Sequence, residues 1–168
     1  MDLKFFAFLC SLLVVICSLL HAQTAAELDR MLETNAVTVG RAARFAFGAA
    51  GLLQEGLSDD AAEAMAYNEA KSRGWVKNQS GAAISLQDMA FLFVNVFEIK
   101  GGIMYRLFRN PRYAYREMIY QRLIQGRRSY SHVTVDGPRF LQILGRTLNY
   151  SGEREEMDAM LRKSEDFR

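Results

Sequence analysis

Residues 84–97 read ISLQDMAFLFVNVF, and this stretch contains the features around which the chain is organised. Ser85 precedes a long apolar run, so its hydroxyl oxygen is placed to accept a hydrogen bond from the first turn of a helix. Asp88, three residues later, supplies the acid of a capping box in its shorter form. Residues 86–97 are apolar on most sides and would span about 18 Å as a helix, too short for a bilayer. We therefore predict a central, enclosed helix.

Two other segments share the pattern of a β-branched residue, a hydroxyl residue, a hydrophobe and then a helix. They begin with Val37-Thr38-Val39 and Val133-Thr134-Val135, so the three hydroxyl residues are spaced by 47 and 49 positions. A Gly or Asn that can end a helix precedes each segment. These three residues are Asn35, Gly74 and Gly126. The pattern predicts three similar units, and chance likeness among amphipathic helices is the alternative.

The predicted fold class is all-α. We expect three tandem helix-pair repeats packed as one pseudo-threefold domain over residues 23–150, with short extended segments before capped helices. The first helices of the second and third pairs are predicted over residues 61–73 and 113–125. Residues 151–168 are predicted to be a charged C-terminal tail.

The three segments resemble S-layer homology repeats, in which a helix and a Gly-containing turn precede an Ile-Thr-Arg-Ala-Glu-like helix start. Residues 84–88 keep the Ile, the hydroxyl and the acid of that start, and the resemblance covers about residues 25–150. It implies the repeat architecture. In the family, the Arg of the start helps to bind anionic cell-wall polysaccharide, but its position falls on Val39, Leu86 and Val135 here. The resemblance therefore implies no binding residue in this chain.

Residues 1–22 have the composition of an export signal. Lys4 supplies a positive charge, and the next 16 residues are uncharged and almost all apolar. We predict cleavage after Ala22 and a periplasmic or secreted protein without a later transmembrane span. A retained anchor and a lipid-anchored form through Cys17 are the alternatives. Both cysteines lie in this segment, so the mature chain would have no thiol for a disulfide, a metal site or a nucleophile.

Charge is unevenly distributed along the chain. Residues 100–150 carry a net charge of +8, whereas the whole chain carries +2, and nine of the ten cations in this segment are arginines. Arginine binds carboxylates and phosphates in a two-pronged geometry. The predicted partner-binding residues are Arg109, Arg112, Tyr113, Arg116, Arg127 and Arg128. Pairing of these arginines with the protein's own acidic segments is the alternative, and export disfavours nucleic acid as the partner.

Groups suited to catalysis are sparse. Asp59 and Asp60 follow Ser58 and are interpreted as the first turn of a helix. His132 is the one histidine after the signal segment, near Ser131 and Asp136, and we interpret it as a loop residue rather than a catalytic base. No metal or cofactor is predicted.

The sequence therefore favours an exported, non-catalytic envelope protein with a binding or scaffold role. Its predicted partner is an envelope protein. Binding of anionic cell-wall polysaccharide or peptidoglycan is the second hypothesis, and an enzyme is the third.

Overall fold

A computed structural model describes residues 26–54, 56–125 and 130–165 of the chain. These residues form mainly α-helices, and the β-structure among them is limited to two single-residue bridges, so the predicted all-α class is confirmed. The predicted signal segment lies outside the described residues. The helices are residues 26–32, α2 (Val39–Ala49), α3 (Asp59–Ser72), α4 (Leu86–Val96), α5 (Ile103–Leu107), α6 (Pro111–Tyr120) and α7 (Gly137–Glu165).

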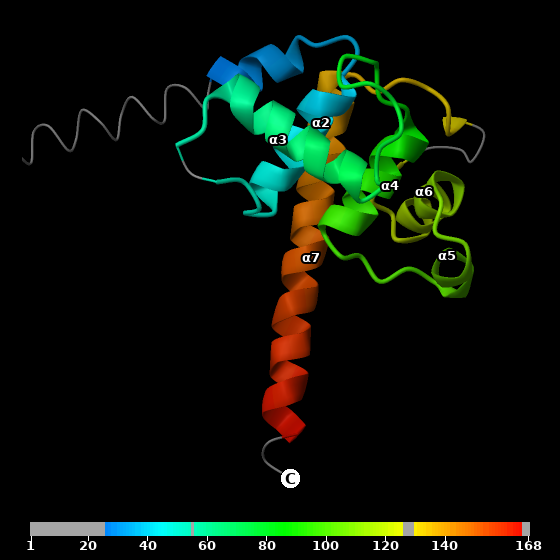
Figure 1. The fold of residues 1–168 in the computed structure, drawn as a ribbon. Coiled ribbons are helices and arrows are strands. Elements are labelled where there is room, and N and C mark those ends of the chain that lie inside the picture. Colours follow the sequence, from blue (N-terminus) through cyan, green and yellow to red (C-terminus); the bar gives the residue numbers. More distant parts are fainter. Residues whose placement is uncertain (1–25, 55, 126–129, 166–168) are drawn as a thin grey trace, which may run out of the picture.

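The helix α4 is enclosed, as predicted: eight of its 11 residues are buried. The ring of Phe93 in α4 meets that of Phe140 in α7 edge-on, with centroids 5.5 Å apart. Phe140 in turn meets Phe45 of α2 at 6.1 Å. These contacts join α2, α4 and α7 in one core. Figure 1 shows α5 and α6 beside α4, and the second half of α7 extending away from the other helices.

Two of the three predicted helix caps are present. The Thr38 hydroxyl accepts from the Arg41 N–H at 3.3 Å and caps α2. The Ser85 hydroxyl accepts from the Asp88 N–H at 3.3 Å and donates to the Asp88 carboxylate at 2.7 Å. The predicted N-cap Ser85 is therefore confirmed, while the Asp88 carboxylate accepts from the Ser85 hydroxyl and not from the Ser85 backbone N–H of a full capping box.

The predicted third cap, Thr134, is wrong. The helix α7 begins at Gly137, and the Asp136 carboxylate accepts from the Arg139 N–H at 2.8 Å. Thr134 instead forms a backbone bridge with Ser85. Asp caps a helix as well as Thr does, so two candidate caps two residues apart could not be separated by residue type.

Three distant backbone segments meet just before α2, α4 and α7. The Val37 N–H donates to the Val135 carbonyl at 2.8 Å, the Ile84 N–H to the Val37 carbonyl at 2.8 Å, and the Val135 N–H to the Ile84 carbonyl at 3.2 Å. We call this closed set of three bonds the backbone ring. Its residues are fully buried. The Gly137 N–H also donates to the Thr34 carbonyl at 2.8 Å, which ties the start of α7 to the end of helix 26–32.

The helix ends agree with the sequence in one case out of three. The predicted helix over residues 61–73 is confirmed as α3, which is followed by Gly74 with a φ of 72°. The predicted helix over residues 113–125 is α6, which ends earlier, at Tyr120. There Arg122 has the left-handed φ of 61°, and Gly126 lies outside the described residues. Asn35 does not have a positive φ, and the helix before it ends at residue 32.

The segment predicted as a C-terminal tail continues α7. This helix runs over 29 residues from Gly137 to Glu165 without a break at residue 150. Beyond residue 151, those side chains that the structure describes are mostly exposed and add little to the core. No helix among the described residues is both long and apolar enough to span a membrane.

Candidate functional site

The loop between α4 and α6 positions the short helix α5. Glu98 ends α4 with a left-handed φ of 48°, and the Ile99 N–H donates back to the Val94 carbonyl at 3.0 Å. Gly102 precedes α5 and offers no side-chain cap. Its N–H donates to the Glu117 carboxylate of α6 at 3.0 Å. The start of α5 is therefore held against α6 by a charge-assisted hydrogen bond.

The helix α5 exposes most of its apolar side chains. Only Tyr105 faces inward, with 7% of its surface exposed. The other large side chains of α5 and its C-cap are 54% to 75% exposed: Ile103, Met104, Leu107 and Phe108. Four large apolar side chains grouped on one short segment form a patch of the kind that marks an interaction site.

The helix α6 places the predicted arginines beside this patch. Asn110 caps α6 by accepting from the Tyr113 N–H at 3.1 Å. Arg112 and Arg116, one helical turn apart, are both exposed. The Tyr113 ring stacks on the Phe108 ring, with centroids 5.7 Å apart and planes 24° apart. The Arg116 guanidinium lies 5.8 Å from the centroid of the Tyr113 ring.

These residues form one continuous feature, which we call the α5–α6 surface. Met118 on the opposite side of α6 is buried, and Leu123 and Ile124 are buried just beyond the helix. Ile119 is only partly buried. The members of the α5–α6 surface are Ile103, Met104, Leu107, Phe108, Arg112, Tyr113 and Arg116.

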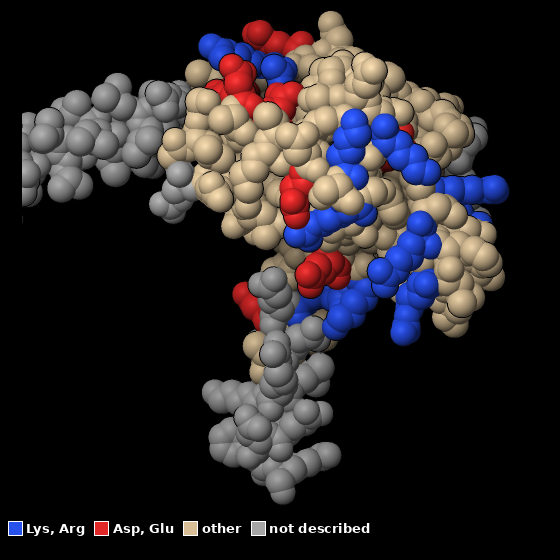
Figure 2. Space-filling model, viewed as in Figure 1, with Lys and Arg blue, Asp and Glu red and all other residues tan. Residues whose placement is uncertain are grey.

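The charge of the α5–α6 surface is not neutralised from within the described chain. Neither Arg112 nor Arg116 forms an ion pair with any acidic residue that the structure describes. Glu117, the one acid of α6, is used by the Gly102 N–H and by the Gln121 amide at 3.0 Å. Figure 2 shows that Lys and Arg gather on the side of the molecule where α4, α5 and α6 lie.

The predicted partner-binding residues divide between two places. Arg112, Tyr113 and Arg116 lie together on the α5–α6 surface. Arg109 instead lines a cavity on the α4 side of α5. Arg127 and Arg128 lie outside the described residues. The sequence prediction missed the apolar patch, although a short apolar run directly after Gly101-Gly102 is a signal that could have indicated it.

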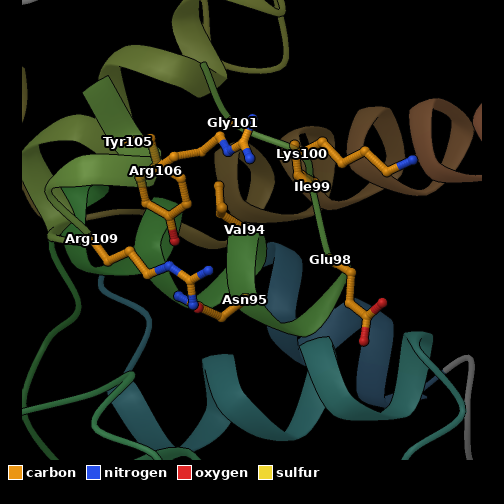
Figure 3. A pocket seen from close by; sticks show the side chains of 9 residues that line it. All are labelled: Val94, Asn95, Glu98, Ile99, Lys100, Gly101, Tyr105, Arg106 and Arg109. Atoms are coloured by element: carbon orange, nitrogen blue, oxygen red, sulfur yellow. The ribbon is translucent and has the colours of Figure 1, made fainter. Parts of the chain in front are cut away.

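The cavity has a volume of about 630 Å³ and opens between the end of α4 and α5 (Figure 3). Its side chains are contributed by the last turn of α4, the following loop and α5: Val94, Asn95, Glu98, Ile99, Lys100, Gly101, Tyr105, Arg106 and Arg109. It therefore has three cations and one carboxylate. A volume of this size is within the range of small-molecule sites.

Tyr105 forms a buried wall of the cavity. Burial raises the pKa of its phenol above the ordinary value of 10.0, because the charged form is poorly solvated there. A hydrogen bond with the Asn95 side chain and the positive charge of Arg109 act in the opposite direction and are smaller effects. The Asn95 amide also donates to the Phe91 carbonyl at 2.6 Å. At neutral pH the wall is therefore an uncharged phenol beside fixed positive charges.

The residues considered for catalysis have structural roles. Asp59 and Asp60 lie in the first turn of α3, as predicted, and Asp59 pairs with Arg44 of α2 at 2.7 Å. The Asp136 carboxylate caps α7, and the exposed His132 ring is 3.2 Å from the Gln87 amide. Among the described residues, no three His, Cys, Asp or Glu side chains lie close enough together to hold a metal ion.

Comparisons of the chain with protein-family models, with curated proteins and with solved structures find no match.

Proposed function

We propose that this protein is an exported, non-catalytic binding protein that docks an acidic partner protein of the cell envelope on its α5–α6 surface. The observation that carries this proposal is the exposed apolar patch of α5 bordered by two arginines without ion pairs among the described residues. The export signal predicted from residues 1–22 supports the location.

The composition of the surface favours a protein partner. Protein interfaces are enriched in Met, Arg and aromatic residues and depleted in Lys and Glu. The α5–α6 surface contains Met104, Phe108 and Tyr113 together with two arginines, and it contains no lysine. Stacking between Phe108 and Tyr113 also fixes both rings before a partner arrives, which reduces the entropy lost on binding.

The charge of the surface favours acidic residues on the partner. The exposed Arg112 and Arg116 have guanidinium groups that can each bind a carboxylate through two hydrogen bonds. The alternative, pairing with this protein's own acids, has no support among the described residues, where the ion pairs involve Arg44 and Arg73 instead.

A non-catalytic role is supported by the structural contacts of three carboxylates. Asp59 neutralises Arg44, Asp136 caps α7, and Glu117 holds the start of α5. Each of these three carboxylates has a structural partner.

We also propose that the described chain consists of three helix-pair units around a pseudo-threefold axis. The backbone ring supports this, because Val37, Ile84 and Val135 each donate to one member and accept from another. The helix packing has the same cyclic order. The proposed units are helix 26–32 with α2, α3 with α4, and α6 with α7. The second helix of each unit contacts the first helix of the next: α2 contacts α3, α4 contacts α6, and Gly137 at the start of α7 abuts Met31 of helix 26–32.

Polysaccharide binding like that of S-layer homology repeats is the second candidate, and the cyclic arrangement is the observation in its favour. Thr38, Ser85 and Asp136 each directly follow a member of the backbone ring, so these three residues occupy equivalent positions. The family's Arg position is the next residue, which is Val39, Leu86 or Gly137. All three are buried and none is charged, which leaves this candidate without a ligand residue.

The test uses the double charge reversal Arg112→Glu/Arg116→Glu. Its matched control is Arg30→Glu/Lys77→Glu, which changes the net charge equally at two exposed sites away from α6. The wild-type chain should co-purify an acidic protein from the native envelope fraction. The purified pair should then associate at least tenfold more weakly with the α6 variant than with the control.

The melting temperatures of the two variants should equal that of the wild type. A fall in melting temperature for the α6 variant with unchanged association would mean that the arginines pair internally, and would contradict the proposal. Equal binding of wild type and α6 variant to the envelope protein would also contradict it. Binding to anionic phospholipid vesicles or to purified wall polymer, without binding to a protein, would replace the proposed partner by a lipid or a polysaccharide.

A further inference from the structure

We propose that the cavity between the end of α4 and α5 binds a small organic anion through its carboxylate or phosphate group. This inference goes beyond the docking proposal, because it concerns a small molecule and depends on different arginines. The ligand class follows from the charges, the walls and the size of the cavity.

The cations of the cavity come from separate parts of its wall. Arg106 lies on α5, Arg109 follows that helix, and Lys100 belongs to the loop after α4. In Figure 3 the Arg109 side chain extends to the hydroxyl end of Tyr105, and the Arg106 side chain extends toward Gly101. The two guanidinium groups therefore lie at different parts of the cavity, and each can offer paired N–H donors to the oxygens of a carboxylate or phosphate group.

The negative charge of the cavity is confined to one end. Glu98 is its one carboxylate, and Figure 3 shows this side chain well separated from that of Arg109. Neither Arg106 nor Arg109 forms an ion pair with an acidic residue in the part of the chain that the structure describes. An organic anion in the cavity would supply a countercharge to these arginines.

The remaining walls suit an organic ligand better than a bare ion. Val94 and Ile99 provide apolar surface, and the phenol of Tyr105 provides a ring face and a hydroxyl group. About 630 Å³ is far more than one phosphate ion fills and is sufficient for a molecule of the size of a six-carbon sugar acid.

Gly101 sets the position of Tyr105 in this wall. A Cβ atom at Gly101 would lie 2.9 Å from both Cβ and Cγ of Tyr105, which is closer than carbon atoms approach without a shift. The substitution Gly101→Ala should therefore displace the ring and alter the cavity without changing any charge.

Binding is measured by isothermal titration calorimetry on the full chain with four probes: inorganic phosphate, glucose 6-phosphate, glucuronate and glucose. Glucose 6-phosphate or glucuronate should bind with a dissociation constant of about 1 mM or lower, and glucose should not bind. The phosphate and carboxylate probes distinguish the two sources of negative charge. Weak binding of inorganic phosphate alone would reduce the site to a general anion site and contradict an organic ligand.

The variant Arg106→Gln/Arg109→Gln should raise the dissociation constant at least tenfold. The control Arg112→Gln/Arg116→Gln removes the same charge from the α5–α6 surface and should leave binding unchanged. Gly101→Ala should weaken binding with all charges retained. Equal weakening in both double variants would assign the binding to general electrostatic attraction and overturn the proposal, as would the absence of binding by both sugar anions.

These outcomes are separable from those of the docking proposal. Loss of anion binding in Arg106→Gln/Arg109→Gln leaves Arg112 and Arg116 intact, so association with an envelope protein is measured independently on the same variant.

Discussion

Gly137 begins α7 against the backbone of Met31, at the end of helix 26–32. A Cβ atom there would overlap the carbonyl oxygen of Met31, which belongs to the backbone and cannot rotate away. The Gly137 N–H also bonds the Thr34 carbonyl at 2.8 Å. Glycine is therefore required here by space, whatever its backbone conformation.

Gly137→Ala should lower the free energy of unfolding by about 1–3 kcal/mol, because the start of α7 must move away from Met31. Gly145→Ala is the control, since it lies on the same helix with open space around it. That variant should be more stable by about 0.5–1 kcal/mol. Urea denaturation measures both, and equal effects of the two substitutions would contradict the steric argument.

Tyr105 and Tyr115 give stability a dependence on alkaline pH. Burial raises the pKa of both phenols above 10.0, so the unfolded chain ionises first as the pH increases. The unfolded state then binds fewer protons than the native state, and the free energy of unfolding falls. The contribution of each tyrosine is fully present below pH 10.0 and is lost as the pH rises through its native pKa.

Thermal unfolding followed from neutral pH to above pH 10 should therefore show a falling melting temperature at the alkaline end. In Tyr105→Phe the fall should be shallower, because one of the two raised pKa values is removed. An identical pH profile for wild type and variant would show that Tyr105 ionises equally in both states.

At the scale of the helix, the start of α7 depends on the side chain of Asp136, which the sequence pattern did not identify as the cap. Asp136 accepts from the Arg139 N–H at 2.8 Å, and Thr134 makes only backbone contacts in the bridge with Ser85. Loss of an N-cap leaves an amide of the first turn without a partner.

Asp136→Ala should lower the free energy of unfolding by about 1 kcal/mol, within a range of about 0.5–2 kcal/mol. Thr134→Ala should change it by less than about 0.5 kcal/mol, because its side chain is exposed. Asp136→Asn should restore most of the loss, since the amide oxygen can still accept the hydrogen bond. A larger loss of stability in Thr134→Ala than in Asp136→Ala, measured by chemical denaturation, would mean that Thr134 caps α7 and would contradict this prediction.

The helices that could be predicted are those whose signals are local. Ser58 with Gly74 delimits α3, and Ser85 with a continuous apolar run delimits α4. The end of α6 could not be predicted, because the left-handed position there is held by Arg122, a residue that rarely adopts it without tertiary contacts. From the sequence alone Gly126 is the stronger signal for a helix end, but α6 ends before it, at Tyr120.

The candidate site was predictable only in part, for a similar reason. The one-turn spacing of Arg112 and Arg116 placed both on one exposed face. Whether Arg109 joins them depends on the turn at Phe108 and Asn110, and this turn directs Arg109 into the cavity. The cavity itself arises from how the loop after Glu98 folds back beside α4, which no periodicity in the sequence encodes.

For the whole molecule, the packing of α2, α4 and α7 into one core predicts a single cooperative unfolding transition. The sole Trp, Trp75, packs against Phe47 of α2 with ring centroids 6.1 Å apart, so its fluorescence reports on the contact between α2 and the segment after α3. Far-ultraviolet circular dichroism reports on all helices. The two signals should give the same midpoint in urea. Separate midpoints would mean that the region around Trp75 unfolds independently of other helices.

The backbone ring also determines when along the chain folding can be completed. Val37 receives its partner only from Val135, about a hundred residues later, and without it a buried N–H has no acceptor. Such a long loop is slow to close, so the search that joins these segments should limit the folding rate. A nascent chain that has not reached residue 135 cannot close the ring. On the proposal that the protein is exported, this delay would favour passage of an incompletely folded chain through a narrow channel.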